Sequence, residues 1–348
     1  MSDATAARPP AVEFGTTNFC PVFDGAEVAA TNEALGYDLQ LFGENHNMAA
    51  DVFGELRDAA RATTHIKLLA GPVNFVTRDP GVVASAIAPV HILSGGRAIC
   101  GIARGDSAVA LAGRSPQRHD ALARDLALVR RYLARDTVHF GDRESRLEWI
   151  GSLDYTPVPI ELVCSGPRAI ALAATHADRI GLSVGGNPER VRWALGIIDA
   201  ALDAAGRTRA DVRIGTYLPI AVTDTREEGR REIRYRVPGW AHMSSFPGND
   251  LDAQPEVMRR VTERLRDGYD YRFHRAGVPL DNPNTRQIDE EFGDWFGIGG
   301  PPSYVAERLH ELVELGVGTF VTSMVGEEHE RFALEVIPAV RRAVGAGA

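Results

Sequence analysis

Apolar residues along the chain fall into two patterns that alternate. Short, nearly continuous apolar runs are typical of buried parallel strands, and longer segments with apolar residues at helical spacing are typical of amphipathic helices. The short runs predict strands at Val12–Asn18, Asp38–Phe42, Ile66–Ala70, Arg97–Ala103, Ile160–Cys164, Arg179–Val184, Val212–Val222 and Thr319–Ser323. The longer segments predict helices at Ala26–Leu35, Asp51–Thr63, Pro80–Leu93, Gln117–Ala134, Pro167–Ala177, Pro188–Ala205, Ser303–Leu315 and Glu327–Val344.

Eight strands separated by helices favour one α/β domain, a (β/α)8 TIM barrel, over an open doubly wound sheet. We expect this domain to span 12–345, after a flexible N-terminal tail at 1–11. The barrel closes only if Ala241–Ile298 is an insertion between the seventh and eighth strands. That segment is rich in aromatic residues, so it can be a lid or substrate wall over the active face or a surface for subunit packing. A β-hairpin is expected within Thr137–Ile150.

Composition narrows the class of partner. The 38 basic and 47 acidic residues give a net charge of −9, which argues against nucleic acid as the main ligand. No stretch approaches the roughly 20 apolar residues that a membrane span needs. The three cysteines, Cys20, Cys100 and Cys164, are odd in number and far apart, which favours reduced thiols and a cytoplasmic protein.

Polar residues that directly follow barrel strands are the candidates for chemistry, because the C-terminal ends of the strands form the active-site mouth of such barrels. Asn18 ends the first strand, and the polar cluster Glu44–Asn47 follows the second. His46 in this cluster can donate a hydrogen bond or shuttle a proton, or it can simply cap the next helix. Gly71-Pro72 after the third strand is a candidate cis peptide, although an ordinary turn is the more common arrangement.

Three further strand ends carry glycine together with polar side chains. Arg104, Gly105 and Asp106 follow the fourth strand, where glycine lets the backbone approach a flat ligand and Asp106 can accept a hydrogen bond. Ser165–Arg168 opens a helix after the fifth strand and predicts a small anion site. Gly185-Gly186 opens the next helix, so two neighbouring loops could share one phosphate, although glycine and asparagine also serve as caps.

Several motifs are absent from the sequence. It contains no His-Glu-x-x-His or Cys-x-x-Cys spacing, and we expect no metal site. The Walker A pattern and the dinucleotide fingerprint Gly-x-Gly-x-x-Gly do not occur either. The expected site is therefore a barrel mouth with a phosphate cradle on one side and a polar, aromatic pocket on the other.

Over nearly its whole length the chain resembles the luciferase-like monooxygenases, and within them the oxidoreductases that use the deazaflavin coenzyme F420. The resemblance is carried by TRDP at 77–80, SGGRAICGIARGDSA at 94–108, SGPR at 165–168 and GYDY at 268–271. In that family an Asp-His pair after the second strand touches the ring of the cofactor. The matching pair here is Asn45-His46, so the acid is missing unless Glu44 replaces it. Gly71-Pro72 lies where the family has a cis peptide behind the ring.

The resemblance implies hydride transfer between F420 and a small organic substrate, in a homodimer. It implies that His46, Asp106 and Glu44 are catalytic, with His46 donating to developing charge and Asp106 orienting the ring edge or acting as acid or base. It assigns cofactor binding to Asn18, Asn45, Gly71, Pro72, Arg104, Gly105, Ser165, Gly166, Pro167, Arg168, Gly185 and Gly186. Two alternatives stay open: an FMN-dependent monooxygenase supplied by a separate reductase, and a non-catalytic flavin-binding barrel.

Overall fold

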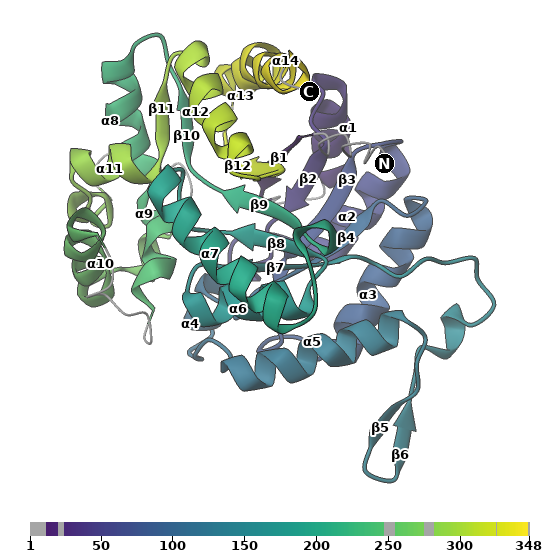
Figure 1. Cartoon of the computed structure of the whole chain (residues 1–348). Coiled ribbons are helices and arrows are strands. Elements are labelled where there is room, and N and C mark those ends of the chain that lie inside the picture. The colour runs from purple at the N-terminus through teal and green to yellow at the C-terminus, as the bar shows by residue number, and fades with distance from the viewer. Residues whose placement is uncertain (1–11, 20–23, 247–254, 275–281, 325, 347–348) are drawn as a thin grey trace, which may run out of the picture.

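The computed structural model describes residues 12–19, 24–246, 255–274, 282–324 and 326–346 (Figure 1). The expected N-terminal tail at 1–11 and Cys20 lie outside these described residues. Cys100 and Cys164 are buried free thiols. None of the described helices combines the length and the apolar character that a membrane crossing requires.

Eight parallel strands close into a barrel. Its strands are β1 (Glu13–Asn18), β2 (Leu39–Phe42), β3 (Lys67–Val73), β4 (Ala98–Ile102), β7 (Ile160–Cys164), β8 (Arg179–Leu182), β9 (Arg213–Tyr217) and β12 (Thr319–Thr322). Each strand pairs with the next along the chain, and β12 pairs with β1 to complete the circle. Nearly every strand residue is buried, because one face meets the outer helices and the other meets the barrel interior. The prediction of a TIM barrel is confirmed.

A ring of helices covers the outside of the barrel. These helices are α1 (Gly25–Leu35), α2 (Val52–Ala62), α3 (Pro80–Leu93), α5 (His119–Leu133), α6 (Pro167–His176), α7 (Pro188–Ala204), α12 (Pro302–Glu314) and α14 (Ile337–Ala346). The outer elements also include two short helices, α4 (Ser107–Leu111) and α13 (Glu327–Arg331), 3-10 turns at Glu148–Ile150 and Arg209–Asp211, and a π-helical turn at Phe332–Val336. The strands β5 (Val138–Phe140) and β6 (Arg143–Ser145) form the expected hairpin, which projects away from the body (Figure 1).

The interior of the barrel carries a chain of buried ionic contacts below the apolar residues of its mouth. Arg179 donates to Glu161 over 2.9 Å and to Glu13 over 2.8 Å, and the Tyr217 hydroxyl donates to Glu161 over 2.5 Å. Burial opposes ionisation of Glu13, yet the facing cations lower its pKa to about 2. A Cβ atom at Gly181 would lie 2.7 Å from the Tyr217 ring, so glycine is needed there to admit these long side chains.

The chain leaves the barrel after the seventh strand earlier than the sequence pattern predicts. Val212–Val222 was expected to be one strand, but β9 ends at Tyr217 and Ile220–Val222 forms β10 outside the barrel. Pro219 lies between them and has no N–H to donate to a barrel ladder. β10 instead pairs with β11 (Ile298–Gly300), so the excursion spans 220–300, which we call the insertion lobe.

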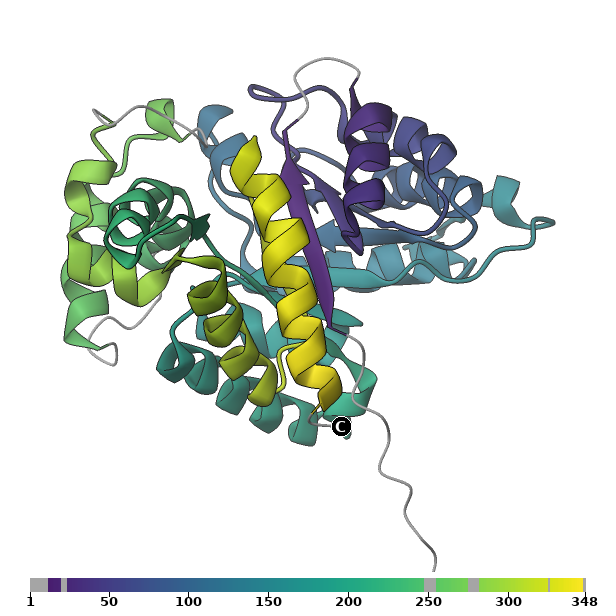
Figure 2. The same ribbon diagram turned by 90° about the horizontal axis from the view of Figure 1, so that it is seen from above.

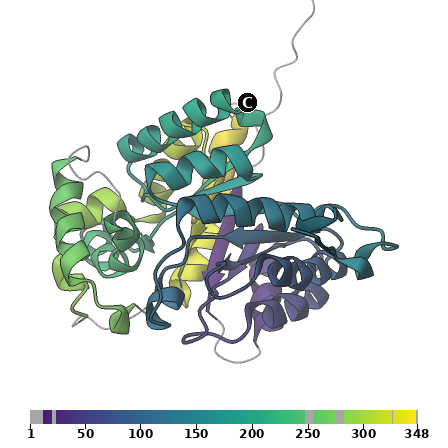
Figure 3. The ribbon, with the colours of Figure 1, turned by 90° about the horizontal axis from the view of Figure 1, so that it is seen from below.

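The insertion lobe has its own small apolar core. It contains α8 (Arg226–Arg236), α9 (Pro238–Ala241), α10 (Glu256–Gly268), α11 (Glu290–Phe296) and short 3-10 turns at His242–Ser245, Tyr271–Phe273 and Thr285–Gln287. Among its fully buried side chains are Ile233, Met258, Val261, Phe292 and Phe296. Figures 2 and 3 show the lobe as a separate group of helices at one side of the barrel. It is therefore a folded unit placed beside the barrel mouth.

Candidate active site

A large cavity of about 1150 Å³ lies between the C-terminal ends of the barrel strands and the insertion lobe. Barrel residues on its wall include Thr17, Leu41, Gly71, Pro72, Val163, Tyr217 and Ser323. The insertion lobe contributes Trp240, Met243, Phe246, Tyr269, Phe273 and His274. The cavity is large for a small-molecule site, since such pockets usually measure about 300–1,000 Å³. It is therefore the candidate active site.

The wall between β3 and β4 is built mostly from backbone. The peptide bond between Gly71 and Pro72 is cis, and both residues line the cavity. The pairing of β3 with β4 shifts register between Ala70 and Val73, which places this step at the barrel mouth. A Cβ atom at Gly71 would lie 2.0 Å from the backbone nitrogen of Val73, so only glycine fits there. This wall leaves room for a flat ligand to approach the main chain.

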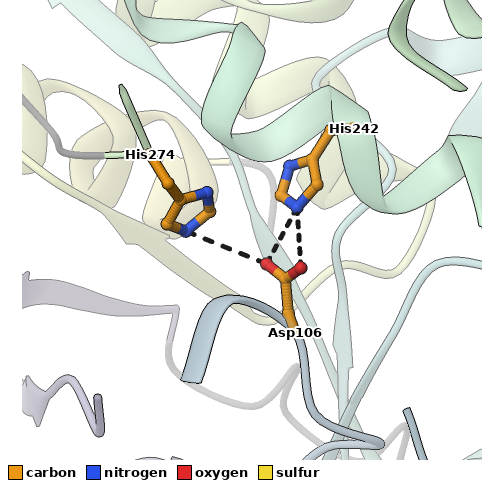
Figure 4. A group of neighbouring side chains, drawn as sticks. All are labelled: Asp106, His242 and His274. Carbon is orange, nitrogen blue, oxygen red and sulfur yellow. Dashed lines mark hydrogen bonds and ion pairs between the residues drawn. The ribbon is translucent and has the colours of Figure 1, made fainter. Parts of the chain in front are cut away.

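Asp106, after β4, is the centre of a cluster of polar side chains from the insertion lobe (Figure 4). The Nε2 atom of His242 lies 2.8 and 2.9 Å from the two carboxylate oxygens of Asp106. The Tyr271 hydroxyl donates to Oδ1 over 2.9 Å, and Nε2 of His274 lies 3.8 Å from Oδ2. These contacts join the β4–α4 loop directly to the insertion lobe.

The surroundings fix the protonation of this cluster. Burial raises the pKa of Asp106, but His242, His274 and Tyr271 together lower it to about 2. Burial and the neighbouring His242 lower the pKa of His274 to about 4. Burial also raises the pKa of Tyr269, whose hydroxyl lies 2.5 Å from Nδ1 of His274. At neutral pH the cluster therefore holds a carboxylate anion, a neutral His274 and a protonated Tyr269.

The same cluster offers donor atoms of the kind that bind divalent cations. One atom each from Asp106, His242 and His274 lies within 4.8 Å of the others. Both carboxylate oxygens already accept hydrogen bonds, from His242 and Tyr271, which account for the close approach of these groups. The motif search missed this grouping because its three members come from distant parts of the chain.

Cationic groups gather at another part of the cavity wall. Ser165–Arg168 at the start of α6 lines the cavity together with Arg104, Arg118 and His119. No side chain caps the N-terminus of α6, whose N-cap residue is Gly166. Burial, Arg104 and Arg168 lower the pKa of His119, which shows how closely the positive charges lie. Backbone N–H groups and guanidinium groups at a helix start suit a phosphate or carboxylate.

The polar cluster after β2 is oriented differently from the expectation. Glu44 lines the cavity, but its carboxylate already accepts from Arg78 over 3.3 Å. Asn45 is buried and donates to the Ser107 hydroxyl over 2.9 Å, which ties this loop to α4. His46 is exposed and does not belong to the cavity wall. Of this cluster only Glu44 reaches the cavity, which Met48 just after the cluster also lines.

Three more of the expected cofactor-binding residues lie away from the cavity wall. Asn18 accepts from the Gln40 side chain over 3.0 Å within the barrel mouth. A Cβ atom at Gly185 would lie 2.5 Å from the Phe296 carbonyl, and one at Gly186 would lie 2.9 Å from the Ile298 side chain. The loop after β8 is thus covered by the insertion lobe. Arg104, Gly105, Asp106 and Ser165–Arg168 do line the cavity as expected.

Residues 16–319 match the sequence model of a family described as luciferase-like monooxygenase. The chain belongs to the luciferase-like monooxygenase family. This confirms the resemblance and accounts for the position of the cavity at the barrel mouth. The match includes the insertion lobe and every cavity residue named above except Ser323.

The relatives of this luciferase-like protein, and the solved structures that are similar to it, match most of its length. The 5,10-methylenetetrahydromethanopterin reductase of Archaeoglobus fulgidus is 25% identical over 89% of this chain and 93% of its own. The structure of the coenzyme F420-dependent tetrahydromethanopterin reductase from Methanopyrus kandleri has a TM-score of 0.70 at 21% identity, covering 94% of this chain and 99% of that one. An F420-dependent secondary alcohol dehydrogenase gives 0.73 at 15% identity, covering 95% and 99%. At these identities the structures establish the fold.

Sequence reasoning missed the partners of Asp106 in this luciferase-like protein. His242 was not singled out from the sequence. The GYDY motif at 268–271 was a usable signal, since both of its tyrosines belong to the cluster. Which of these side chains reaches Asp106 depends on how the insertion lobe folds, which no local pattern reveals.

Proposed function

We propose that this protein is an oxidoreductase that transfers a hydride between coenzyme F420 and a small organic substrate. The observation that carries this proposal is one cavity with two distinct parts. A cationic part surrounds the start of α6, and a polar, aromatic part surrounds Asp106. The names of the relatives support it, because the similar structures include an F420-dependent reductase and an F420-dependent alcohol dehydrogenase.

The residues present fit such a cofactor. A cavity of about 1150 Å³ has room for a cofactor and a small substrate together. The cationic groups at Arg104, Arg118 and Arg168 fit an acidic tail, and the backbone wall at Gly71–Pro72 fits a planar ring. When bound, the deazaflavin supplies a ring carbon that gives or takes the hydride.

The chain's own contribution is binding, orientation and exclusion of water. Arg168 and the free N-terminus of α6 bind the acidic tail. Asp106 stays anionic and fixes the insertion lobe above the site. Trp240 and Phe246 close the cavity on the lobe side and reduce its contact with water. Together these groups hold two flat reactants in a protected space.

FMN is the alternative cofactor. The FMN complex of the oxygenating constituent of 3,6-diketocamphane monooxygenase from Pseudomonas putida has a TM-score of 0.65 at 18% identity. A protein of that kind would use oxygen and depend on a separate reductase. A phosphate-binding site suits both F420 and FMN, because both cofactors carry a phosphate. The two cofactors differ more in their rings. The homodimer and the cytoplasmic location stay predictions.

The test is a pair of titrations of the purified protein with F420 and with FMN, followed by quenching of cofactor fluorescence. We expect saturable binding of F420 that is at least about tenfold tighter than binding of FMN, or about 1.4 kcal/mol. Preference for FMN would support the oxygen-dependent alternative. Binding of neither cofactor would overturn the proposal.

A further inference from the structure

The histidine nearest to Asp106 on the cavity wall comes from the insertion lobe and not from the loop after β2. His46, to which the family resemblance assigned hydrogen-bond donation, is exposed and lies outside the cavity wall. His274 lines the cavity, and its Nε2 atom lies 3.8 Å from Oδ2 of Asp106. The site therefore has an acid beside a histidine, as expected, but the histidine is His274 and not His46.

The hydrogen bond to Tyr269 sets the tautomer of His274. The Tyr269 hydroxyl lies 2.5 Å from Nδ1 of His274, and burial keeps this phenol protonated. A protonated phenol donates to Nδ1, so the single proton of the neutral imidazole sits on Nε2. Among the described residues Nε2 has no partner within hydrogen-bond distance, and the side chain keeps 13% of its surface exposed. Nε2–H is therefore a donor available to a ligand in the cavity.

Asp106 is already engaged by other groups. Its Oδ1 accepts from Tyr271 and His242, and its Oδ2 accepts from His242. His242 is only 1% exposed and does not line the cavity, so it acts on the site through Asp106. The carboxylate thus holds the insertion lobe in place, which leaves His274 as the donor beside it that faces the cavity.

We propose that His274 donates the hydrogen bond to the substrate atom on which negative charge develops during hydride transfer. This inference rests on the proposed function and deepens it. The substrate class that it selects has a carbonyl group at the reacting carbon, because an imidazole N–H needs a compact acceptor there. A neutral histidine in such a role polarises the carbonyl and keeps its own proton.

The reaction balances without proton loss from His274. The hydride of the reduced deazaflavin adds to the carbonyl carbon, and the deazaflavin is oxidised. The carbonyl π electrons move to oxygen, which takes a proton from a water molecule, and the hydroxide so formed takes the proton that the neutral reduced deazaflavin loses on oxidation. His274 stabilises the oxygen anion through Nε2–H before that proton arrives.

The first test measures the tautomer of His274, and it needs no substrate. In 15N-labelled protein, long-range 1H–15N correlation spectra show which imidazole nitrogen carries the proton, and the spectrum of His274→Phe identifies the signals of His274. We expect the proton of His274 on Nε2, and F420 should shift the signals of His274 but not those of His46. A proton on Nδ1 of His274 in the folded protein would overturn the proposal.

The second test measures turnover, with F420 binding as its reference. The variants are His274→Phe, which keeps a planar ring and removes the donor, His274→Gln, which restores an amide donor, and His46→Phe as the matched control. With reduced F420 and acetone as carbonyl probe, we expect His274→Phe to lower kcat/KM about 100-fold. His274→Gln should recover to within about tenfold of the wild type, and His46→Phe should stay within about twofold. F420 affinity should change little in all three.

The outcomes distinguish a failure of the proposed function from a failure of the role of His274. A wild-type protein that does not bind F420 contradicts the proposed function itself. A wild-type protein that binds F420 and reduces acetone, while His274→Phe keeps full turnover and His46→Phe loses it, overturns only the role of His274. If acetone is not reduced, the tautomer of His274 decides the question alone.

Discussion

Two neighbouring loops at the barrel mouth, one after β7 and one after β8, share a sequence pattern but differ in their access to the cavity. Each contains glycine and opens a helix with proline at its first position, Pro167 in α6 and Pro188 in α7. The sequence therefore predicts that the two loops could share one phosphate. In the structure the loop before α6 lines the cavity with Ser165–Arg168, whereas the loop before α7 reaches it only with Ser183.

The first difference is how each helix start is capped. The side chain of Asn187 accepts from the backbone N–H of Glu189 over 2.9 Å, which occupies the N-terminus of α7. α6 has Gly166 at that position and no side-chain cap, so its N–H groups remain for a ligand. The second helical residue also differs, because α6 has Arg168 where α7 has Glu189. One start attracts an anion and the other repels it.

The second difference is the cover provided by the insertion lobe. The backbone N–H of Gly186 donates to the Phe296 carbonyl over 2.7 Å, and the lobe packs directly on this loop. A glycine-rich helix start thus serves here as a docking point for another part of the chain. The pattern shared by the two loops identifies a helix start, and tertiary packing decides whether a ligand can reach it.

The largest expected effect comes from filling the docking point. Gly185 has a φ of +84°, and a Cβ atom there would lie 2.5 Å from the Phe296 carbonyl oxygen. Gly185→Ala should therefore lower the free energy of unfolding by about 3 kcal/mol, through backbone strain and collision together. Urea denaturation measures this change.

Gly206→Ala is the matched control for Gly185→Ala. Gly206 has a φ of +66° and no atom within 4 Å of the added Cβ position. It shares the backbone strain without the collision, so its cost should be about 1 kcal/mol. Equal losses in the two variants would show that the lobe does not press on the loop after β8.

The next effect concerns the loop that lines the cavity. Arg168→Gln removes one cation from the start of α6 and should weaken F420 binding by roughly 30-fold, or about 2 kcal/mol. Glu189→Gln, at the matching position of α7, should leave the affinity within about twofold. Fluorescence titration compares the two. An affinity that responds equally to both substitutions would mean that the loop after β8 also contacts the cofactor.

The fold could be predicted from the sequence because its signals are local. Apolar runs marked all eight barrel strands, and position after a strand identified Asp106, Arg104 and Ser165–Arg168 as cavity residues. The misplaced residues depend on longer-range packing. His46 is exposed while its neighbour Asn45 binds Ser107, and Phe296 covers Gly185 in the loop after β8. Local pattern gives no information on either contact.

The smallest expected effect is a change in the pH dependence of stability. It distinguishes the contact of the insertion lobe with Asp106 from its contact with the loop after β8. At the loop after β8 it packs through Phe296 and Ile298, whereas at Asp106 it is attached through groups that titrate. The pKa of His274 falls from 6.5 to about 4 in the folded protein, where Asp106, His242 and Tyr269 face it. Between these pH values the unfolded chain binds a proton that the folded chain does not, so stability falls as the pH is lowered through this range.

When the pH is lowered from 7 to 5.5, the titration of His274 should lower the free energy of unfolding by about 1 kcal/mol. His274→Gln lacks the titrating group and should lose that much less over the same interval, when both proteins are unfolded in urea at the two pH values. Because the contacts of Phe296 and Ile298 carry no titrating side chain, they contribute nothing to the difference. An equal loss in both proteins would mean that His274 is not held in a desolvated position.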